Sequence, residues 1–367
     1  MPESRPANLL RTYASFVKLS HTVFALPFAL VGLAAAHAVP TAFVYPSQVP
    51  GMGPGLPSFD QHMPWLWPMF LLVLLCMVGA RTFAMALNRI IDRRIDALNP
   101  RTAGRELPAG RISPAQAWAL ASASAVLYFG ACFIISPVVF WLSPIPIALM
   151  AIYPYMKRIS ALCHVVLGAS LGLAPIGAWV AVRGLEWENG KLLGPFPALS
   201  SLMGLDVYAA EYSGRIWPLG WGAVSELIPW VLGAGVALWV AGFDIIYALQ
   251  DDEFDRANKL HSIPAAVGRK PALWISRAMH LCAAACFFGF IWLLTHPAPV
   301  AGMDTRQYTH LASWVWAAPC LMLAGLIYQH ALVKPQDLSR VNMAFFTVNG
   351  VLSVLFGATF LAAWLLA

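Results

Sequence analysis

Residues 64–96 read PWLWPMFLLVLLCMVGARTFAMALNRIIDRRID, an apolar run that passes without a break into a charged segment. The run over 64–88 exceeds the roughly 20 residues that an α-helix needs to cross a bilayer. At its end, Asn88, Asp92 and Asp96 recur every four residues, so on a helix they stack along one face, about 6 Å apart in rise. The stretch therefore predicts a membrane-crossing helix whose end presents an amide and two carboxylates on one side.

The composition of the whole chain also points to lipid. Of the 367 residues, 59% are hydrophobic and 11% are charged, whereas soluble domains carry roughly 25% charged residues. A formal charge of +6 would suggest nucleic acid in a soluble protein, but here the basic residues lie in short loops between apolar runs, and we expect no nucleic-acid partner. The six cysteines all lie in apolar runs without a C-x-x-C pair, and we interpret them as small hydrophobic residues.

Runs of similar length predict nine spans in a single domain over 1–367, and hence an all-α membrane protein. The spans lie at about 16–37, 64–88, 114–136, 138–155, 164–182, 226–249, 271–295, 310–333 and 342–366. The fourth is short and is interrupted by Pro144 and Pro146. Two long loop insertions interrupt the spans, at about 38–63 and 183–225, and the second is compatible with a short helix on the membrane surface.

The basic residues predict the orientation of the chain. With the N-terminus in the cytoplasm, only four of the 23 Lys and Arg residues fall on the outer face, namely Arg183, Lys191, Arg215 and Arg306. Arg81 lies within a span and the remaining 18 lie at or near the inner face, as the positive-inside rule requires. We therefore expect a multi-pass protein of a bacterial-type inner membrane, with its C-terminus outside. A cleaved signal ending near Ala38 is the alternative for the first span, and the eight further spans disfavour it.

A second acidic stretch repeats the spacing of the first. Tyr247, Asp251 and Asp255 recur every four residues, and Asp244 lies two turns before Asp251 on the same side. Each stretch alone could be a solvated helix end, but both are predicted at the same membrane face. Stacked carboxylates repel unless a cation lies between them, and hard oxygen ligands suit Mg²⁺, which binds one or two carboxylates together with substrate phosphates. The pair of stretches predicts a magnesium-bridged diphosphate site.

Basic residues that could contact a diphosphate lie on the same face, in the stretches 99–111 and 153–158, although each could instead only anchor the topology. Arg81 differs because it lies inside a span, where a charge costs roughly 2.5–3.5 kcal/mol. Two turns below Asn88, its guanidinium could grip a carboxylate of a bound substrate with two hydrogen bonds. The alternatives are a contact with the diphosphate or an ion pair with Asp244.

Together these motifs resemble the UbiA superfamily of intramembrane prenyltransferases. The shared pattern is N-x-x-x-D-x-x-x-D, then R-T-x-x-R-x-L-P-x-G, Y-x-x-x-K and Y-x-x-x-D-x-x-x-D. The resemblance implies a helical bundle around a central cavity that opens sideways to lipid, under a cytoplasmic cap. The metal and diphosphate residues that it implies are Asn88, Asp92, Asp96, Asp251 and Asp255. The implied substrate contacts are Arg81, Arg105, Tyr153 and Lys157. Asp244 and Tyr247 are implied to flank the reacting centre.

Two positions depart from the family pattern. Arg89 stands where Asp often follows the motif Asn, and His261 stands where 4-hydroxybenzoate enzymes usually have Lys. His261 is a candidate contact for the aromatic acid, or else a plain polar loop residue. The segment His261-Ser-Ile-Pro264 is similar to a branch that includes menaquinone prenyltransferases, whose acceptor is a dihydroxynaphthoate.

The resemblance implies magnesium-dependent transfer of a polyprenyl group from its diphosphate to 4-hydroxybenzoate or a dihydroxynaphthoate, in ubiquinone or menaquinone biosynthesis. Haem, chlorophyllide or glycerol phosphate are alternative acceptors. An ion-coupled transporter is a further alternative, but transporters place such charges near the midplane of the bilayer.

Overall fold

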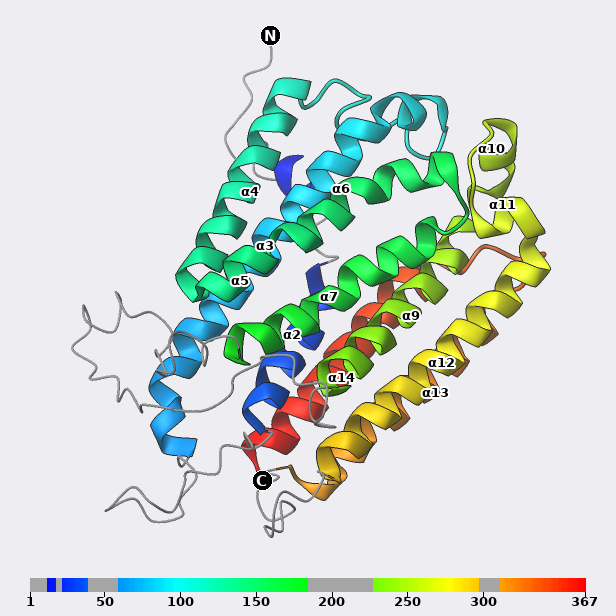
Figure 1. The fold of residues 1–367 in the computed structure, drawn as a ribbon. Helices are drawn as coiled ribbons and strands as arrows, with labels where there is room; N and C mark the ends of the chain where they lie inside the picture. Colours follow the sequence, from blue (N-terminus) through cyan, green and yellow to red (C-terminus); the bar gives the residue numbers. More distant parts are fainter. Residues whose placement is uncertain (1–11, 18–21, 39–58, 184–226, 297–310) are drawn as a thin grey trace, which may run out of the picture.

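The computed structural model of the chain describes residues 12–17, 22–38, 59–183, 227–296 and 311–367, and these form a helical bundle (Figure 1). Its helices are α2 (Thr22–Ala38), α3 (Phe59–Leu98), α4 (Pro114–Ile135), α5 (Pro137–Leu142), α6 (Pro144–Ile159), α7 (Cys163–Arg183), α9 (Ile228–Ala248), α10 (Asp252–Ala257), α11 (Ile263–Val267), α12 (Arg269–Thr295), α13 (Ala317–Leu332) and α14 (Asn349–Leu365). Short helices at Ser313–Trp316 and Met343–Val348 lead into α13 and α14.

Within the described residues, eight helical segments are long and apolar enough to cross a membrane, where the sequence predicted nine. The first predicted span is not among the eight, since α2 covers Thr22–Ala38 and its apolar part, Phe24–Ala36, is shorter than a typical span. The other eight predicted spans are all found. Nearly all of the predicted insertions, and the surface helix within the second, lie outside the described residues.

The fourth predicted span is built from two helices joined at Ser143. Ser136 caps α5 by accepting a hydrogen bond from the backbone N–H of Val139 at 3.2 Å. Pro144 then starts α6, a position that proline favours because its missing N–H has no helical partner there. The prolines thus divide the span without ending it, and the apolar segment runs over Val138–Ile159.

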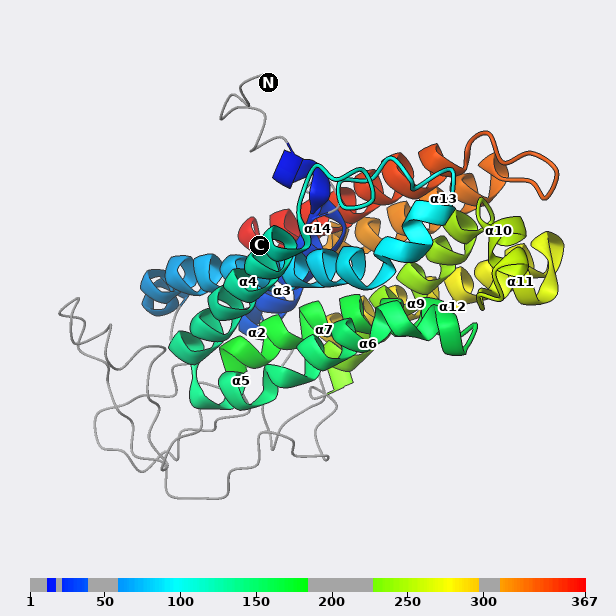
Figure 2. The same ribbon diagram turned by 90° about the horizontal axis from the view of Figure 1, so that it is seen from above.

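The core of the bundle is built around α9, which packs between α7 and α12. A Cβ on Gly168 would lie 2.1 Å from the carbonyl oxygen of Ala237, and one on Gly172 would lie 2.5 Å from that of Gly233. Only glycine permits this approach, so Gly168-x-x-x-Gly172 is a close helix-packing motif. In Figures 1 and 2, α3 and α4 lie on one side of the molecule and α12 and α13 on the other.

Both acidic stretches lie at one end of the bundle, here called the motif end, opposite the C-terminus (Figure 1). The first prediction is confirmed, because α3 continues through Leu98 and keeps Asn88, Asp92 and Asp96 on one uninterrupted helix. The second needs correction. α9 stops at Ala248 and α10 starts at Asp252, so Tyr247 and Asp251 do not share one helix, and Asp251 has a non-helical ψ of 3°.

Candidate functional site

The two motif carboxylates at the end of α3, Asp92 and Asp96, are each paired with a cation from another segment. Nη2 of Arg158, at the end of α6, donates to Oδ1 of Asp92 at 2.8 Å. Nη1 of Arg105, in the loop after α3, donates to Oδ1 of Asp96 at 2.7 Å. Arg89, the departure from the family pattern, is buried with Nη1 3.9 Å from the second oxygen of Asp96. Both motif carboxylates are therefore neutralised from neighbouring elements.

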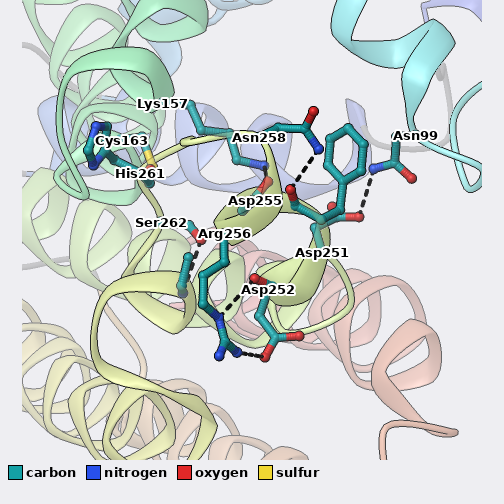
Figure 3. Close-up of polar contacts among 12 residues, drawn as sticks. Asn99, Lys157, Cys163, Asp251, Asp252, Asp255, Arg256, Asn258, His261 and Ser262 are labelled. Carbon is teal, nitrogen blue, oxygen red and sulfur yellow. Dashed lines mark hydrogen bonds and ion pairs between the residues drawn. The ribbon is translucent and has the colours of Figure 1, made fainter.

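The carboxylates of the second stretch are paired in the same manner. Nε of Arg101 donates to Oδ1 of Asp251 at 2.9 Å, Nη2 of Arg101 donates to its other oxygen, and Nδ2 of Asn99 donates to Oδ1 at 3.1 Å. Nζ of Lys157 lies 2.8 Å from Oδ1 of Asp255. Figure 3 shows Asp251 beside Asn99 and Asp255 beside Lys157, whereas Asp252 points toward Arg256.

Two basic segments thus connect the acidic stretches. The end of α6 supplies Arg158 to the first stretch and Lys157 to the second. The loop 99–113 supplies Arg105 to the first and Arg101 to the second. The sequence predicted that the two aspartate stretches would share one site, and each of these basic segments contacts both stretches.

The buried carboxylates retain unused acceptor capacity. The side chain of Asp255 is 0% exposed; its Oδ1 has the ion pair with Lys157, and its Oδ2 is buried without a hydrogen bond. Oδ2 of Asp96 is likewise buried without a hydrogen bond. A buried carboxylate oxygen without a donor is costly, and a bound cation would remove that cost.

These donors suit Mg²⁺ better than a softer metal, because they are oxygens and carry negative charge. In the part of the chain that the structure describes, no group of three or more His, Cys, Asp or Glu side chains is close enough to hold a metal by itself.

Electrostatics keep Asp251 charged. Burial alone would raise the pKa of Asp251, but the hydrogen bonds and charge of Arg101 hold it below its ordinary value. Burial alone would lower the pKa of Arg101, and its bonds to Asp251 and Tyr247 raise it instead. Both groups of this pair are therefore ionised near neutral pH.

Tyr247 and Asp244 mark the accessible side of α9. Between Trp239 and Leu249 they are the two half-buried positions, and every other residue is buried. The hydroxyl of Tyr247 accepts a hydrogen bond from Nη1 of Arg101 at 2.7 Å, and its ring stacks on Phe345 at 4.1 Å. These two predicted site residues therefore face the same side as the paired carboxylates.

Arg81 has no fixed partner in the described part of the chain. It is half-buried on α3, and its Nε is buried without a hydrogen bond. The predicted alternative pair with Asp244 is not formed, since Asp244 contacts His164 instead. Asn88 and Tyr153 are also half-buried, and their side chains make no hydrogen bond among the described residues.

His261 lies beside the end of α6, and its side chain is exposed. Its backbone N–H donates to the carbonyl oxygen of Lys157 at 2.7 Å, and its carbonyl oxygen accepts from Sγ of Cys163 at 3.5 Å. The backbone of His261 therefore links the segment after α10 to the end of α6 and the start of α7.

Several residues at this site had no role in the prediction. Asn99, Arg101 and Arg158 lie in the basic stretches that the sequence marks, and only their partners were unknown. His164 carried no such signal, whereas Asp252 lies within the second acidic stretch. Oδ1 and Oδ2 of the buried Asp252 accept hydrogen bonds from Nη2 and Nε of Arg269, both at 2.9 Å, and Arg256 adds a third at 2.7 Å.

Comparison with known proteins agrees with this geometry. The UbiA prenyltransferase family model matches residues 58–351. The 4-hydroxybenzoate octaprenyltransferase of Yersinia pseudotuberculosis serotype IB is 26% identical over 289 residues, which cover 77% of this chain and 80% of the relative. That of Yersinia enterocolitica is 26% identical over 287 residues, covering 77% and 79%.

Solved structures show the same fold. The apo structure of a UbiA homolog from Aeropyrum pernix K1 has a TM-score of 0.66 and 30% identity, and the match covers 93% of this chain and 97% of that one. A UbiA homolog from Archaeoglobus fulgidus bound to GPP and Mg²⁺ has a TM-score of 0.57 at 17% identity, covering 96% and 99%. The second similarity establishes the fold alone.

Proposed function

Since this chain belongs to the UbiA prenyltransferase family, we propose that it transfers a polyprenyl group from polyprenyl diphosphate to an aromatic acid, with Mg²⁺ as cofactor. The acceptor is 4-hydroxybenzoate or a dihydroxynaphthoate, and the product enters ubiquinone or menaquinone biosynthesis. The observation that carries the proposal is the set of four carboxylate–cation pairs that joins the two aspartate stretches.

These pairs present the two kinds of group that a magnesium diphosphate requires. The four aspartates and Asn88 would hold the metal, which when bound neutralises the charge of the diphosphate and favours its departure. Arg105, Lys157 and Tyr153 would contact the diphosphate oxygens. We add Arg101 and Arg158 to these contacts, because each lies beside a motif aspartate. In this proposal, the Arg and Lys side chains release their aspartate partners when the substrate binds and pair with its diphosphate instead.

The basic side chains also supply transition-state stabilisation. Charge builds up on the diphosphate as the allylic C–O bond breaks, and fixed Arg and Lys side chains stabilise that charge where it develops. The remaining allylic cation must be kept from water, and the surrounding helices are apolar. Asp92 and Asp251 are the central acidic groups of this machinery, with Asp244 and Tyr247 flanking the reacting centre.

The acceptor would bind deeper in the bundle. Arg81 precedes Asn88 by two helical turns on α3, which corresponds to about 10 Å along the helix axis. Its guanidinium is free to form two parallel hydrogen bonds with an aromatic carboxylate. We propose this role for Arg81, with the exposed His261 as a secondary contact at the entrance.

The orientation remains part of the proposal. The charge asymmetry supports a motif end in the cytoplasm, a C-terminus outside and a location in a bacterial-type inner membrane. The segments 99–113 and 251–268 would form the cap over a central cavity that opens to lipid.

Among acceptors, the aromatic acids are favoured because the curated relatives named above are 4-hydroxybenzoate octaprenyltransferases. Haem, chlorophyllide and glycerol phosphate remain as alternatives to be tested. The transporter interpretation is set aside, because the family is one of enzymes.

The test is a product assay with a panel of acceptors. Purified protein in mild detergent is incubated with Mg²⁺, farnesyl diphosphate and one acceptor at a time, and products are identified by mass spectrometry. We expect a prenylated product with 4-hydroxybenzoate or a dihydroxynaphthoate, dependent on Mg²⁺. A product only with glycerol phosphate, haem or chlorophyllide would refute the aromatic assignment.

A further inference from the structure

His164, the second residue of α7, connects the reacting side of α9 to the cap. It is buried, with 2% of its surface exposed. Its Nδ1 lies 2.7 Å from Oδ2 of Asp244 on α9, and its Nε2 accepts the backbone N–H of Ile263 at 3.3 Å. One imidazole thus bridges α7, α9 and the start of α11.

These two contacts determine the tautomer of the ring. The backbone N–H of Ile263 can only donate, so Nε2 of His164 carries no proton and the proton of a neutral imidazole is on Nδ1. Nδ1–H then donates to Oδ2 of Asp244, which accepts as a carboxylate. The other oxygen, Oδ1, makes no hydrogen bond in the described part of the chain, and the side chain of Asp244 retains 15% exposure.

Asp244 lies below the acidic stretch that follows it, as Arg81 does. Asp244 precedes Tyr247 by three residues on α9, and Arg81 precedes Asn88 by seven on α3. Both helices run toward the motif end, so Asp244 lies about 4.5 Å below Tyr247 and Arg81 about 10 Å below Asn88. Asp244 is therefore placed between the acidic stretches and the level at which Arg81 is proposed to bind the acceptor.

We infer that Asp244 is the base that removes the proton from the aromatic acceptor, and that His164 is its positioning residue. This inference rests on the proposed function. In the step, a π-electron pair of the ring forms the new C–C bond to the allylic carbon, whose bonding pair has left with diphosphate. The C–H bond at the same ring carbon then breaks, its electron pair restores aromaticity, and the proton moves to Oδ1 of Asp244.

Two substitutions separate this role from simple docking of the cap. In His164→Asn, the carboxamide N–H₂ replaces the Nδ1–H donor to Asp244, but the contact with Ile263 is lost. In His164→Gln, the longer side chain offers its carbonyl oxygen to Ile263 near the position of Nε2, but the donor to Asp244 is lost. Cys163→Ala is the matched control, because Cys163 adjoins His164 on α7 and contacts His261 rather than Asp244.

The experiment measures three quantities for each variant with farnesyl diphosphate and the preferred aromatic acid. They are the rate of prenylated product, the rate of diphosphate release, and the kinetic isotope effect with acceptor deuterated at the reacting ring carbon. Size-exclusion chromatography and thermal unfolding confirm that each variant is folded. The isotope effect and the ratio of the two rates are not changed by a purely structural role.

We expect His164→Gln to lower the rate of prenylated product about 10²-fold, the loss typical of a reacting group displaced by about 1 Å. Diphosphate release should fall less, with farnesol as the by-product, and a primary isotope effect should appear as proton removal becomes limiting. Asp244→Asn should lower the product rate by about 10²–10⁴-fold with the same signature. The product rate of His164→Asn should stay within about tenfold of the wild-type rate. The product rate of Cys163→Ala should equal that of the wild type.

Either of two results would overturn the inference. One is a His164→Gln enzyme of wild-type rate beside an impaired His164→Asn enzyme, which would make His164 an anchor for the cap only. The other is a parallel loss of product and diphosphate release without an isotope effect. A wild-type enzyme that prenylates no aromatic acid would instead refute the proposed function itself.

Discussion

Lys157 Nζ lies 2.8 Å from Oδ1 of Asp255, a carboxylate that is fully buried within the cap segment α10. The next residue, Arg158, reaches the other acidic stretch at Asp92. The end of α6 therefore touches both aspartate stretches through two consecutive side chains. This arrangement explains how the acidic helix ends can lie near each other before any metal binds.

Removing Lys157 should destabilise the protein more than removing Arg158. Lys157→Met leaves Asp255 buried and unpaired, which costs on the order of 3–5 kcal/mol. Arg158→Met is the matched control, since the Asp92 side chain is 23% exposed and can be partly solvated. Thermal unfolding in detergent without Mg²⁺ should show the larger fall in Tm for Lys157→Met, and the double variant Lys157→Met/Asp255→Asn should recover most of it. Equal effects of the two single variants would contradict this explanation.

Asp252 should make the stability of the cap depend on acid. Burial alone would raise the pKa of Asp252, but the hydrogen bonds and charges of Arg269 and Arg256 hold it below its ordinary value of 3.8. A lowered folded-state pKa gives stabilisation that is complete above about pH 4 and is lost as pH falls through the folded-state value.

Asp252→Asn should therefore lower the stability by about 1 kcal/mol at pH 7, and the difference from wild type should shrink below about pH 4. Unfolding curves at pH 7 and at pH 3 measure it. Glu253→Gln serves as the control, because Glu253 bonds the same Arg269 but its side chain is 83% exposed. A difference from wild type that is equally large at both pH values would exclude the ionised Asp252 as its source.

Arg81→Lys should affect the aromatic acid and spare the prenyl diphosphate. The substitution keeps the charge but removes the planar fork that binds a carboxylate through two bonds. We expect the KM for the aromatic acid to rise about tenfold or more, which corresponds to about 1.4 kcal/mol, while the KM for prenyl diphosphate stays nearly constant. The reverse pattern would assign Arg81 to the diphosphate, and no change in either would make it structural.

The predictable parts of this protein are those encoded locally. Apolar length located eight spans, and the four-residue spacing correctly indicated that Asn88, Asp92 and Asp96 lie on one helix. The same spacing failed at Asp251, because Asn99 and Arg101 from a distant loop bind its carboxylate where α9 ends. Residue spacing predicts which side chains would share one face of a helix, but it does not predict where a tertiary contact ends that helix.

The partners in the site could not be predicted from spacing. Arg101 and Arg158 were recognisable as basic residues near the motifs, but their pairing with Asp251 and Asp92 depends on how α6 and the loop 99–113 pack against α3 and α9. His164 could not be singled out from the sequence, because a histidine at the start of an apolar helix has no evident role by itself. Its role follows only from its contacts with Asp244 and Ile263.

The central claim is that the two acidic stretches act together on one magnesium–diphosphate unit. The most direct test is the rate of prenyl transfer as a function of Mg²⁺ concentration for wild type, Asp92→Ala and Asp251→Ala, with thermal unfolding as the control for folding. We predict that each variant remains folded and loses prenyl transfer by at least about 10²–10³-fold, the effect of removing one preorganised charge-stabilising group. Near-normal turnover of either variant at limiting Mg²⁺ would contradict the shared site.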